Sequence, residues 1–305
     1  MVEMGGGPFF SFISHFVSLP DPMPVEVGNL KFEYPVGMPS GWIDDLHKLR
    51  TAHRMGVGIP IIKTVTVQPR KGNPRPRILR GENYLINSMG LPNKGMQWWK
   101  ERLQGMKRDR PLLLSIRGET EEEWEQLVEE FDSKVDLIEL NFSCPNTEGG
   151  VMDVEESVRI LEGVLGLSDK LWLKLSPEFS ARENLELVKR VSTSIQGVTL
   201  INTVPVKDER LGNPRKVGGL SGLPILERLK DQLAVFRKEF PAFSDLPIFA
   251  TGGITPDTAV EILREFRAIP FMLTSFLMEG PWTYVRATER VRGELGEGSL
   301  ADLLD

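Results

Sequence analysis

One cysteine lies among polar residues at the end of an apolar run. Cys144 follows Asn141 in the segment NFSCPNT (141–147), and Pro145 ends the run directly after it. Most single cysteines are buried and inert, but this one is flanked by amide side chains that can hold a ligand. A thiolate at this position can remove a proton from a bound substrate.

Polar residues also come late in other apolar runs. Lys63 lies in PIIKTVTV (60–67), Lys174 in LWLKLSP (171–177), and Asn202 with Thr203 near the end of GVTLINTV (197–204). If these runs are parallel barrel strands, their carboxyl ends meet at one mouth. Burying amines and amides is costly unless they are paired, so we expect a polar ligand with carbonyl groups and charge.

Glycine pairs follow two of the later runs and predict a phosphate site. Gly218-Gly219 and Gly252-Gly253 can expose backbone N–H groups, and Thr274 near the end of PFMLTSF (270–276) adds a hydroxyl. A pair of glycines alone is more often a tight turn. The combination with the threonine favours the phosphate site.

The chain alternates apolar runs with amphipathic segments, which predicts a single (β/α)8 TIM barrel of the α/β class. The helical segments are 119–131, 154–165, 223–240 and 258–266. Two stretches, 68–90 and 206–222, are predicted to be loop insertions at the carboxyl ends of strands, where the functional residues of barrel enzymes lie. The eight expected strands are 34–40, 60–67, 111–118, 137–143, 171–177, 197–204, 247–254 and 270–276.

Composition excludes several classes of protein. The formal charge of −6 offers no attraction for nucleic acid, and a single cysteine allows no disulfide within the chain, no CxxC zinc site and no four-thiolate cluster. The three histidines lie within the first 53 residues and predict no metal site. No apolar run is long enough for a membrane span. We expect a cytoplasmic protein.

We interpret the aromatic segment from Pro8 to Pro20 as an arm that packs on the domain or takes part in an oligomer contact. Glycines and Glu3 precede it where a secretory signal would carry positive charge. We therefore expect an N-terminal arm over residues 1–23 and one barrel domain over residues 24–305.

From about residue 24 onward the chain resembles the dihydroorotate dehydrogenases. NFSCPNT is similar to their active-site loop, and further similar segments follow in the matching order: KTVTVQPRKGNPRPR (63–77), INSMGLPNKG (86–95), LWLKLSP, LINT, GGLSG and ATGGI. The resemblance implies FMN-dependent oxidation of dihydroorotate to orotate in de novo pyrimidine biosynthesis. Cys144 would take the C5 proton while hydride leaves C6 for flavin N5. A cysteine here resembles the soluble members, because the quinone-using members have serine.

The resemblance also implies the binding residues. Lys174 matches the lysine beside the N1 and O2 edge of the flavin, and the loop from Cys144 to Met152 resembles a lid with Gly149-Gly150 as its hinge. Substrate positions are Lys63, Asn87, Met89, Gly90, Leu91, Asn141, Asn146, Asn202 and Thr203. Lys63 is also expected at the catalytic centre. FMN positions are Ser40, Gly41, Lys63, Thr64, Asn141, Lys174, Ile201, Ser221, Gly222, Gly252, Gly253 and Thr274.

Two residues depart from the family pattern and bear on the flavin contacts. Leu273 replaces the usual glycine before the phosphate-binding threonine, and Pro39 replaces a small residue before Ser-Gly. Either can shift the phosphate or the edge of the flavin.

Other functions stay open at this point. An enzyme for another dihydropyrimidine and a non-catalytic flavin-binding subunit are alternatives, whereas a tRNA dihydrouridine synthase would need a basic face. Asn146-Thr147 and NSMGLPN (87–93) favour dihydroorotate. The resemblance is strongest to the homodimeric, fumarate-using subgroup and predicts a homodimer. NAD is the other acceptor, and its use requires a separate subunit with FAD and an iron-sulfur cluster.

Overall fold

Eight parallel strands close into a barrel in the computed structural model, which describes residues 7–142, 154–295 and 300–304. The order around the barrel is β10-β13-β14-β3-β4-β7-β8-β9. The predicted barrel is confirmed, and each of the eight expected runs overlaps one of its strands; β4 and β14 begin one residue before the expected runs. These are β3 (Gly37–Met38), β4 (Ile59–Val65), β7 (Leu113–Ile116), β8 (Leu137–Asn141), β9 (Leu171–Lys174), β10 (Gly197–Leu200), β13 (Ile248–Thr251) and β14 (Ile269–Phe271).

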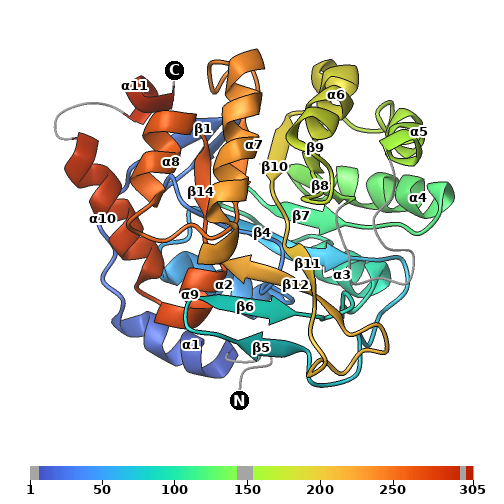
Figure 1. Cartoon of the computed structure of the whole chain (residues 1–305), viewed down its shortest axis with the longest axis horizontal. Helices are drawn as coiled ribbons and strands as arrows, with labels where there is room; N and C mark the ends of the chain where they lie inside the picture. Colours follow the sequence, from blue (N-terminus) through green and yellow to red (C-terminus); the bar gives the residue numbers. More distant parts are fainter. Residues whose placement is uncertain (1–6, 143–153, 296–299, 305) are drawn as a thin grey trace.

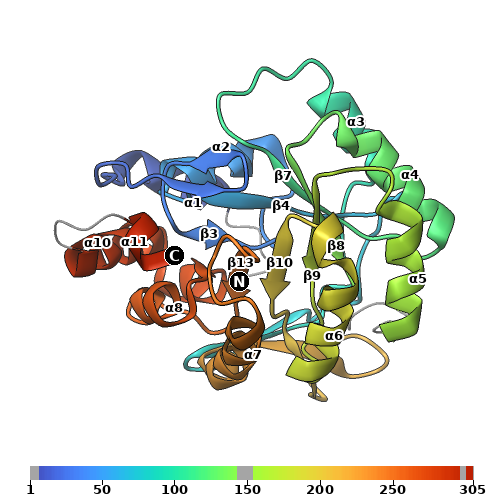
Figure 2. The ribbon, with the colours of Figure 1, turned by 90° about the horizontal axis from the view of Figure 1, so that it is seen from above.

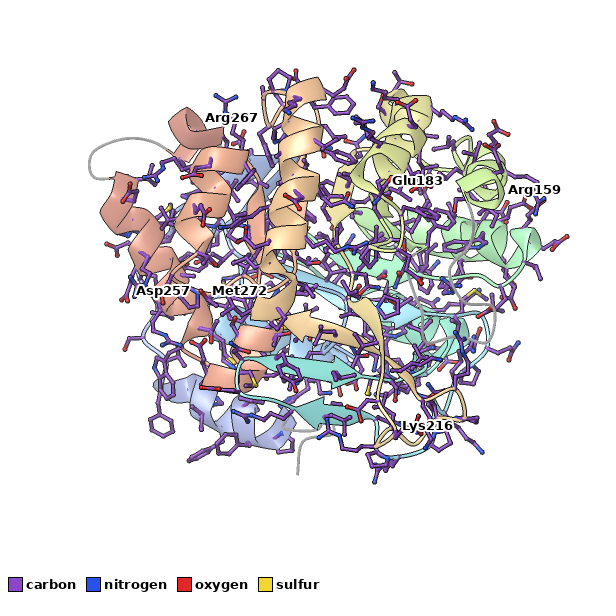
Figure 3. The ribbon with its side chains drawn as sticks, in the orientation of Figure 1. Arg159, Glu183, Lys216, Asp257, Arg267 and Met272 are labelled. Atoms are coloured by element: carbon purple, nitrogen blue, oxygen red, sulfur yellow. The ribbon has the colours of Figure 1, made fainter. Side chains whose placement is uncertain are left out.

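Amphipathic helices surround the barrel, as Figure 2 shows from above. The four predicted helical segments are confirmed, and they correspond to α4, α5, α7 and α8. Charged residues such as Arg159 on α5 and Glu183 on α6 lie on the outer surface (Figure 3). The helices are α2 (Leu46–Arg54), α3 (Met96–Leu103), α4 (Glu121–Asp132), α5 (Val154–Val164), α6 (Ala181–Val191), α7 (Leu226–Glu239), α8 (Ala259–Phe266), α9 (Thr274–Glu279), α10 (Thr283–Leu295) and α11 (Leu300–Leu304).

Local sequence explains where two of these helices begin. Thr120 caps α4 by accepting a hydrogen bond from the Glu123 N–H, and three glutamates occupy the first turn, where the helix dipole favours negative charge. Ser180 and Glu183 form a reciprocal capping box at the start of α6. Both caps fix the residue at which the loop after a barrel strand ends and the helix on the outside of the barrel begins.

The two predicted loop insertions contain strands, which corrects the sequence-based prediction. They form a four-stranded antiparallel sheet from β5 (Ile78–Arg80), β6 (Tyr84–Asn87), β11 (Val204–Lys207) and β12 (Val217–Gly222). Figure 1 shows these strands side by side below the barrel. The central pairing joins β6 to β12, with Leu220 opposite Ile86. Because that pairing is so distant in sequence, the local glycine and proline pattern did not reveal it.

Aromatic rings close the inside of the barrel. Trp172 stacks on Phe249 with ring centroids 3.9 Å apart, and Phe249 stacks on Phe271 at 4.5 Å. A Cβ atom at Gly37 or Gly197 would lie 2.4 Å from one of these rings, so both strands need glycine there to make room. The hairpin of β1 (Val25–Val27) and β2 (Leu30–Phe32) packs in the same cluster.

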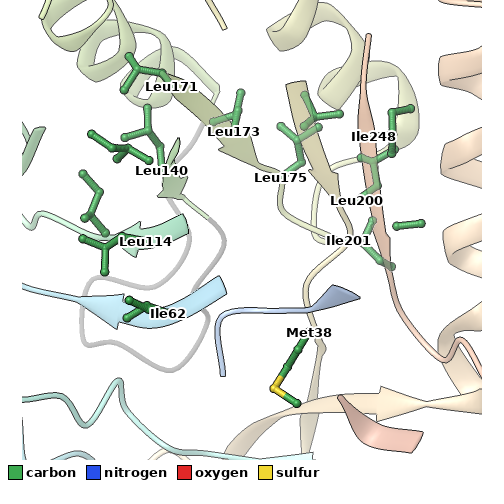
Figure 4. Packing of buried hydrophobic residues seen from close by; sticks show 14 of the residues in the cluster. Met38, Ile62, Leu114, Leu140, Leu171, Leu173, Leu175, Leu200, Ile201 and Ile248 are labelled. Carbon is green, nitrogen blue, oxygen red and sulfur yellow. The ribbon is translucent and has the colours of Figure 1, made fainter. Parts of the chain in front are cut away.

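Alternation along the strands then places polar side chains above these rings. Residues two apart on a strand share a face, so Glu139 and Asn141 on β8 lie on one side, and Trp172 and Lys174 on β9 also share a face. The intervening leucines, among them Leu140 and Leu173, pack toward the helices in the main apolar core (Figure 4). The barrel thus carries its polar groups inside and toward one mouth.

The N-terminal segment packs onto the outside of the barrel. In α1 (Gly7–Ile13), Phe10 contacts Trp42 and Phe276 of α9, with ring centroids 5.9 and 4.7 Å apart. Phe9 and Phe12 are exposed. The domain boundary after residue 23 stays a prediction. None of the described helices is both long and apolar enough to cross a membrane.

Candidate active site

A cavity lies between the mouth of the barrel and the added antiparallel sheet. Its free space is about 1150 Å³ including the open entrance, which is large enough for small-molecule ligands. Barrel strand ends supply Lys63 and Lys174, while Leu85 and Asn87 come from β6 and Ser221 from β12. The sheet that the sequence did not predict therefore forms part of the cavity wall.

Sixteen of the predicted site residues line this cavity. They are Ser40, Gly41, Lys63, Thr64, Asn87, Met89, Leu91, Asn141, Lys174, Ile201, Asn202, Thr203, Ser221, Gly252, Gly253 and Thr274. Gly90 and Gly222 are not in the lining but adjoin residues that are. Cys144, Asn146 and the expected lid over residues 144–152 lie outside the described residues.

Lys174 is held in the cavity by a buried carboxylate. Its Nζ lies 3.8 Å from Oε1 of Glu139 and donates to Oγ of Ser40 at 3.1 Å. The Glu139 side chain is fully buried. Sequence reasoning missed Glu139, although a glutamate inside the apolar run LIEL, two residues before Asn141, was the available signal.

Lys63 is the second buried amine of the cavity, and it lacks such a partner. Within the part of the chain that the structure describes, no carboxylate oxygen lies within 4.0 Å of its Nζ; Asp44 is paired instead with Lys48. Burial lowers the pKa of Lys63 to about 8, with further lowering by Lys48 and Arg77 and an opposing effect of Asp44. An anionic ligand group is the kind of partner that this amine can accept.

Hydrogen bonds fix the amide between the two lysines. Asn141 Nδ2 donates to Oγ1 of Thr64 at 2.9 Å, and Thr64 Oγ1 lies 3.0 Å from Oγ of Ser115. The main-chain carbonyl of Asn141 accepts from the buried Arg117 guanidinium at 3.1 Å. Locked rotamers of this kind pre-organise a binding site.

The far end of the cavity carries hydroxyls and glycine turns. Thr274 Oγ1 donates to Oγ of Ser221 at 2.9 Å, and Ser221 in turn donates to the Leu85 carbonyl. Gly253 has a φ of +78°, and a Cβ there would lie 2.5 Å from the carbonyl oxygen of Gly222. Only glycine allows the two turns to approach this closely.

The two departures from the family pattern both lie at the cavity. Pro39 and Leu273 are lining residues. A Cβ at Gly41 would lie 2.5 Å from Cδ2 of Leu273, so the leucine side chain packs directly over this glycine. Leu273 therefore uses the space that Gly41 leaves free.

Comparison with known proteins assigns the family. The model of the dihydroorotate dehydrogenase family matches residues 23–291. The chain belongs to the dihydroorotate dehydrogenase family. It is an oxidoreductase of a flavoenzyme family, and the predicted family, fold and oxidation of dihydroorotate in pyrimidine synthesis are confirmed.

Curated relatives cover most of the chain. The NAD(+)-type dihydroorotate dehydrogenase B catalytic subunit of Pyrococcus abyssi is 35% identical over 256 residues, 78% of this chain and 82% of that one. The Pyrococcus furiosus subunit of the same name is 31% identical, covering 92% of this chain and 95% of its own. A quinone-type dihydroorotate dehydrogenase of Rhizobium etli is 28% identical over 94% of this chain and 86% of that protein.

A solved structure shares the architecture. The dihydroorotate dehydrogenase of Eimeria tenella, crystallised with ferulenol, superposes with a TM-score of 0.82, covering 98% of this chain and 94% of that one. At 21% identity this likeness shows the fold alone. The predicted subgroup and electron acceptor stay predictions, since the curated relatives carry names of two different classes.

The close approach of the two glycine turns predicts a cost for any side chain at Gly253. Gly253→Ala should lower the free energy of unfolding by about 2 kcal/mol, from the strained φ and the contact with Gly222. Gly293→Ala is the matched control: Gly293 lies in α10 with nothing within 4 Å of an added Cβ, and alanine there should stabilise by about 0.5 to 1 kcal/mol. Urea unfolding measures both; equal effects would refute the proposed constraint.

Proposed function

We propose that this chain oxidises dihydroorotate to orotate with FMN and substrate bound together in the barrel-mouth cavity. The observation that carries the proposal is the convergence of two buried lysines, Lys63 and Lys174, on one cavity in a chain of this family. Lys174 has a protein counter-charge, whereas Lys63 has no carboxylate within 4.0 Å among the residues that the structure describes. A cofactor beside the first and an anionic substrate beside the second fit this arrangement.

The residues of the cavity fit FMN in their chemistry. Lys174, Ser40, Thr64 and Asn141 offer a cation, hydroxyls and an amide for a ring with carbonyl and imine groups. Ser221 with Thr274, and the turns at Gly222, Gly252 and Gly253, would hold the phosphate. When bound, FMN supplies the acceptor for the hydride that leaves the substrate.

The other part of the cavity suits orotate and dihydroorotate. Lys63 would pair with the substrate carboxylate, and Asn87 and Asn202 would meet the ring carbonyl and N–H groups. Asn87 Nδ2 already donates to the Gly219 carbonyl at 3.2 Å, which fixes its orientation. Asn141, Asn146, Thr203, Met89, Gly90 and Leu91 complete the proposed substrate set.

Cys144 is the proposed base for the C5 proton of dihydroorotate. Its thiolate would accept that proton from the bound substrate. Positive charge from Lys63 and Lys174 favours a thiolate near them by the same electrostatics that bind the substrate anion. Protonation of the thiolate leaves the substrate ring ready to lose hydride from C6.

We further propose the NAD-linked class for electron removal. The Pyrococcus relatives are named catalytic subunits of NAD-type enzymes, which supports a separate electron-transfer subunit carrying FAD and an iron-sulfur cluster. Fumarate is the alternative acceptor. A homodimer in the cytoplasm completes the proposal.

Replacement of the base tests the reaction directly. Under anaerobic conditions dihydroorotate should bleach the flavin of the purified wild-type chain, and Cys144→Ala should slow the bleaching by at least about 10²-fold because no group takes the C5 proton. Cys144→Ser is the graded control, since a hydroxyl is a weaker acid than a thiol. Stopped-flow absorbance follows all three. If FMN is bound but dihydroorotate does not bleach it, the substrate is another dihydropyrimidine or the chain is not catalytic.

The pKa of Lys63 predicts the pH dependence of orotate binding. With a pKa of about 8, the amine is charged below that pH and loses its charge as the pH rises above it. The Kd for orotate should therefore be flat near pH 7 and should rise up to about tenfold per pH unit above pH 8.

Flavin absorbance reports this binding, and Lys63→Gln is the control. The variant should bind orotate weakly with a flatter profile, and any slope it retains belongs to the ligand or to other groups. A flat wild-type profile between pH 7 and 9.5, or an unchanged slope in Lys63→Gln, would contradict the proposed role of Lys63.

A further inference from the structure

Glu139 is a charged residue inside the barrel that does not line the cavity. It lies on β8, two residues before Asn141, and its side chain has no exposed surface. Glu139 and Thr199 of β10 lie between the aromatic rings at the closed end and the lysine at the mouth. Any effect of this carboxylate on a bound ligand must therefore pass through the side chains in front of it.

Hydrogen bonds satisfy both carboxylate oxygens. Ser40 Oγ donates to Oε1 at 2.6 Å while it accepts from Lys174 Nζ. Thr199 Oγ1 donates to Oε2 at 2.9 Å and itself accepts from Nε1 of Trp172 at 2.9 Å. Two hydroxyl donors and an ammonium 3.8 Å away thus surround the carboxylate. A series of hydrogen bonds links the closed end to the cavity, from Trp172 through Thr199, Glu139 and Ser40 to Lys174.

The two lysines of the cavity differ in whether an acidic side chain lies beside them. Both are buried, but only Lys174 has an acidic partner; the Lys63 amine has none within ion-pair distance among the described residues. A fully buried ion pair is costly to build and is weak evidence for stability by itself. Its position behind a cavity lysine points to a role in the site.

We propose that Glu139 is a positioning residue that acts through Lys174 to set the reduction potential of the bound flavin. The inference rests on the proposed FMN site. Glu139 and Ser40 hold the Lys174 ammonium at the cavity wall, and the carboxylate offsets part of the positive charge that the flavin experiences. Since reduction adds negative charge to the flavin, a lone lysine would stabilise the reduced form more than the pair does.

The test is the midpoint potential of the FMN-loaded chain at pH 7. Glu139→Gln keeps the size of the side chain and one of its two acceptor oxygens but removes the negative charge. The equilibrium constant for two-electron reduction should therefore rise at least tenfold, which corresponds to about 30 mV. The affinity of the oxidised flavin for sulfite, a second readout independent of substrate, should increase in parallel. Thr199→Val removes a hydroxyl from the same carboxylate without changing any charge, and should shift the potential far less.

A comparison of Lys174→Gln with a double variant covers the case in which Glu139→Gln does not fold. Lys174→Gln should lower the potential, and the double variant Glu139→Gln/Lys174→Gln, which buries no charge, should have a higher potential than Lys174→Gln alone. The proposal is overturned if Glu139→Gln leaves the potential unchanged or lowers it, or if the double variant equals Lys174→Gln. Failure of the wild type to bind FMN would refute the proposed function instead.

Discussion

The ion pair between Glu139 and Lys174 constrains the residues around it and the cavity that lies above it in the barrel. Its members are 3.8 Å apart and almost without exposed surface. Removing either partner would leave an uncompensated charge at a buried position, at a cost of about 3 to 5 kcal/mol. The surrounding residues are therefore constrained to supply donors. Thr199 does so from β10, and Ser40 does so from the turn that follows β3.

The layers on either side of this pair follow from the same constraint. Below it, the stacked rings of Trp172, Phe249 and Phe271 fill the barrel, and Trp172 uses its one polar atom on Thr199. Above it the strands end, and the antiparallel sheet of β5, β6, β11 and β12 forms the opposite wall of the cavity. The ammonium of Lys174 thus faces the cavity, where a ligand completes its surroundings.

Much of this site could be predicted from the sequence because its residues interrupt otherwise apolar runs. Lys63, Asn141 and Lys174 each come late in a strand, and parallel strands bring such positions to one mouth. Glu139 escaped notice because it lies in the middle of its strand, where a functional residue was not expected. The antiparallel sheet was missed because Leu220 of β12 pairs with Ile86 of β6, and only the fold brings these residues together. Cys144 and Asn146 stay predictions, because they lie outside the described residues.

A crystal structure of the purified chain grown with orotate would test the central claim most directly, namely that one barrel-mouth cavity holds both the flavin and the substrate. The account predicts FMN with its ring beside the Glu139 and Lys174 pair, its phosphate at Ser221 and Thr274, and the orotate carboxylate at Lys63. Orotate bound away from Lys63, or a flavin ring without contact to Lys174, would contradict it.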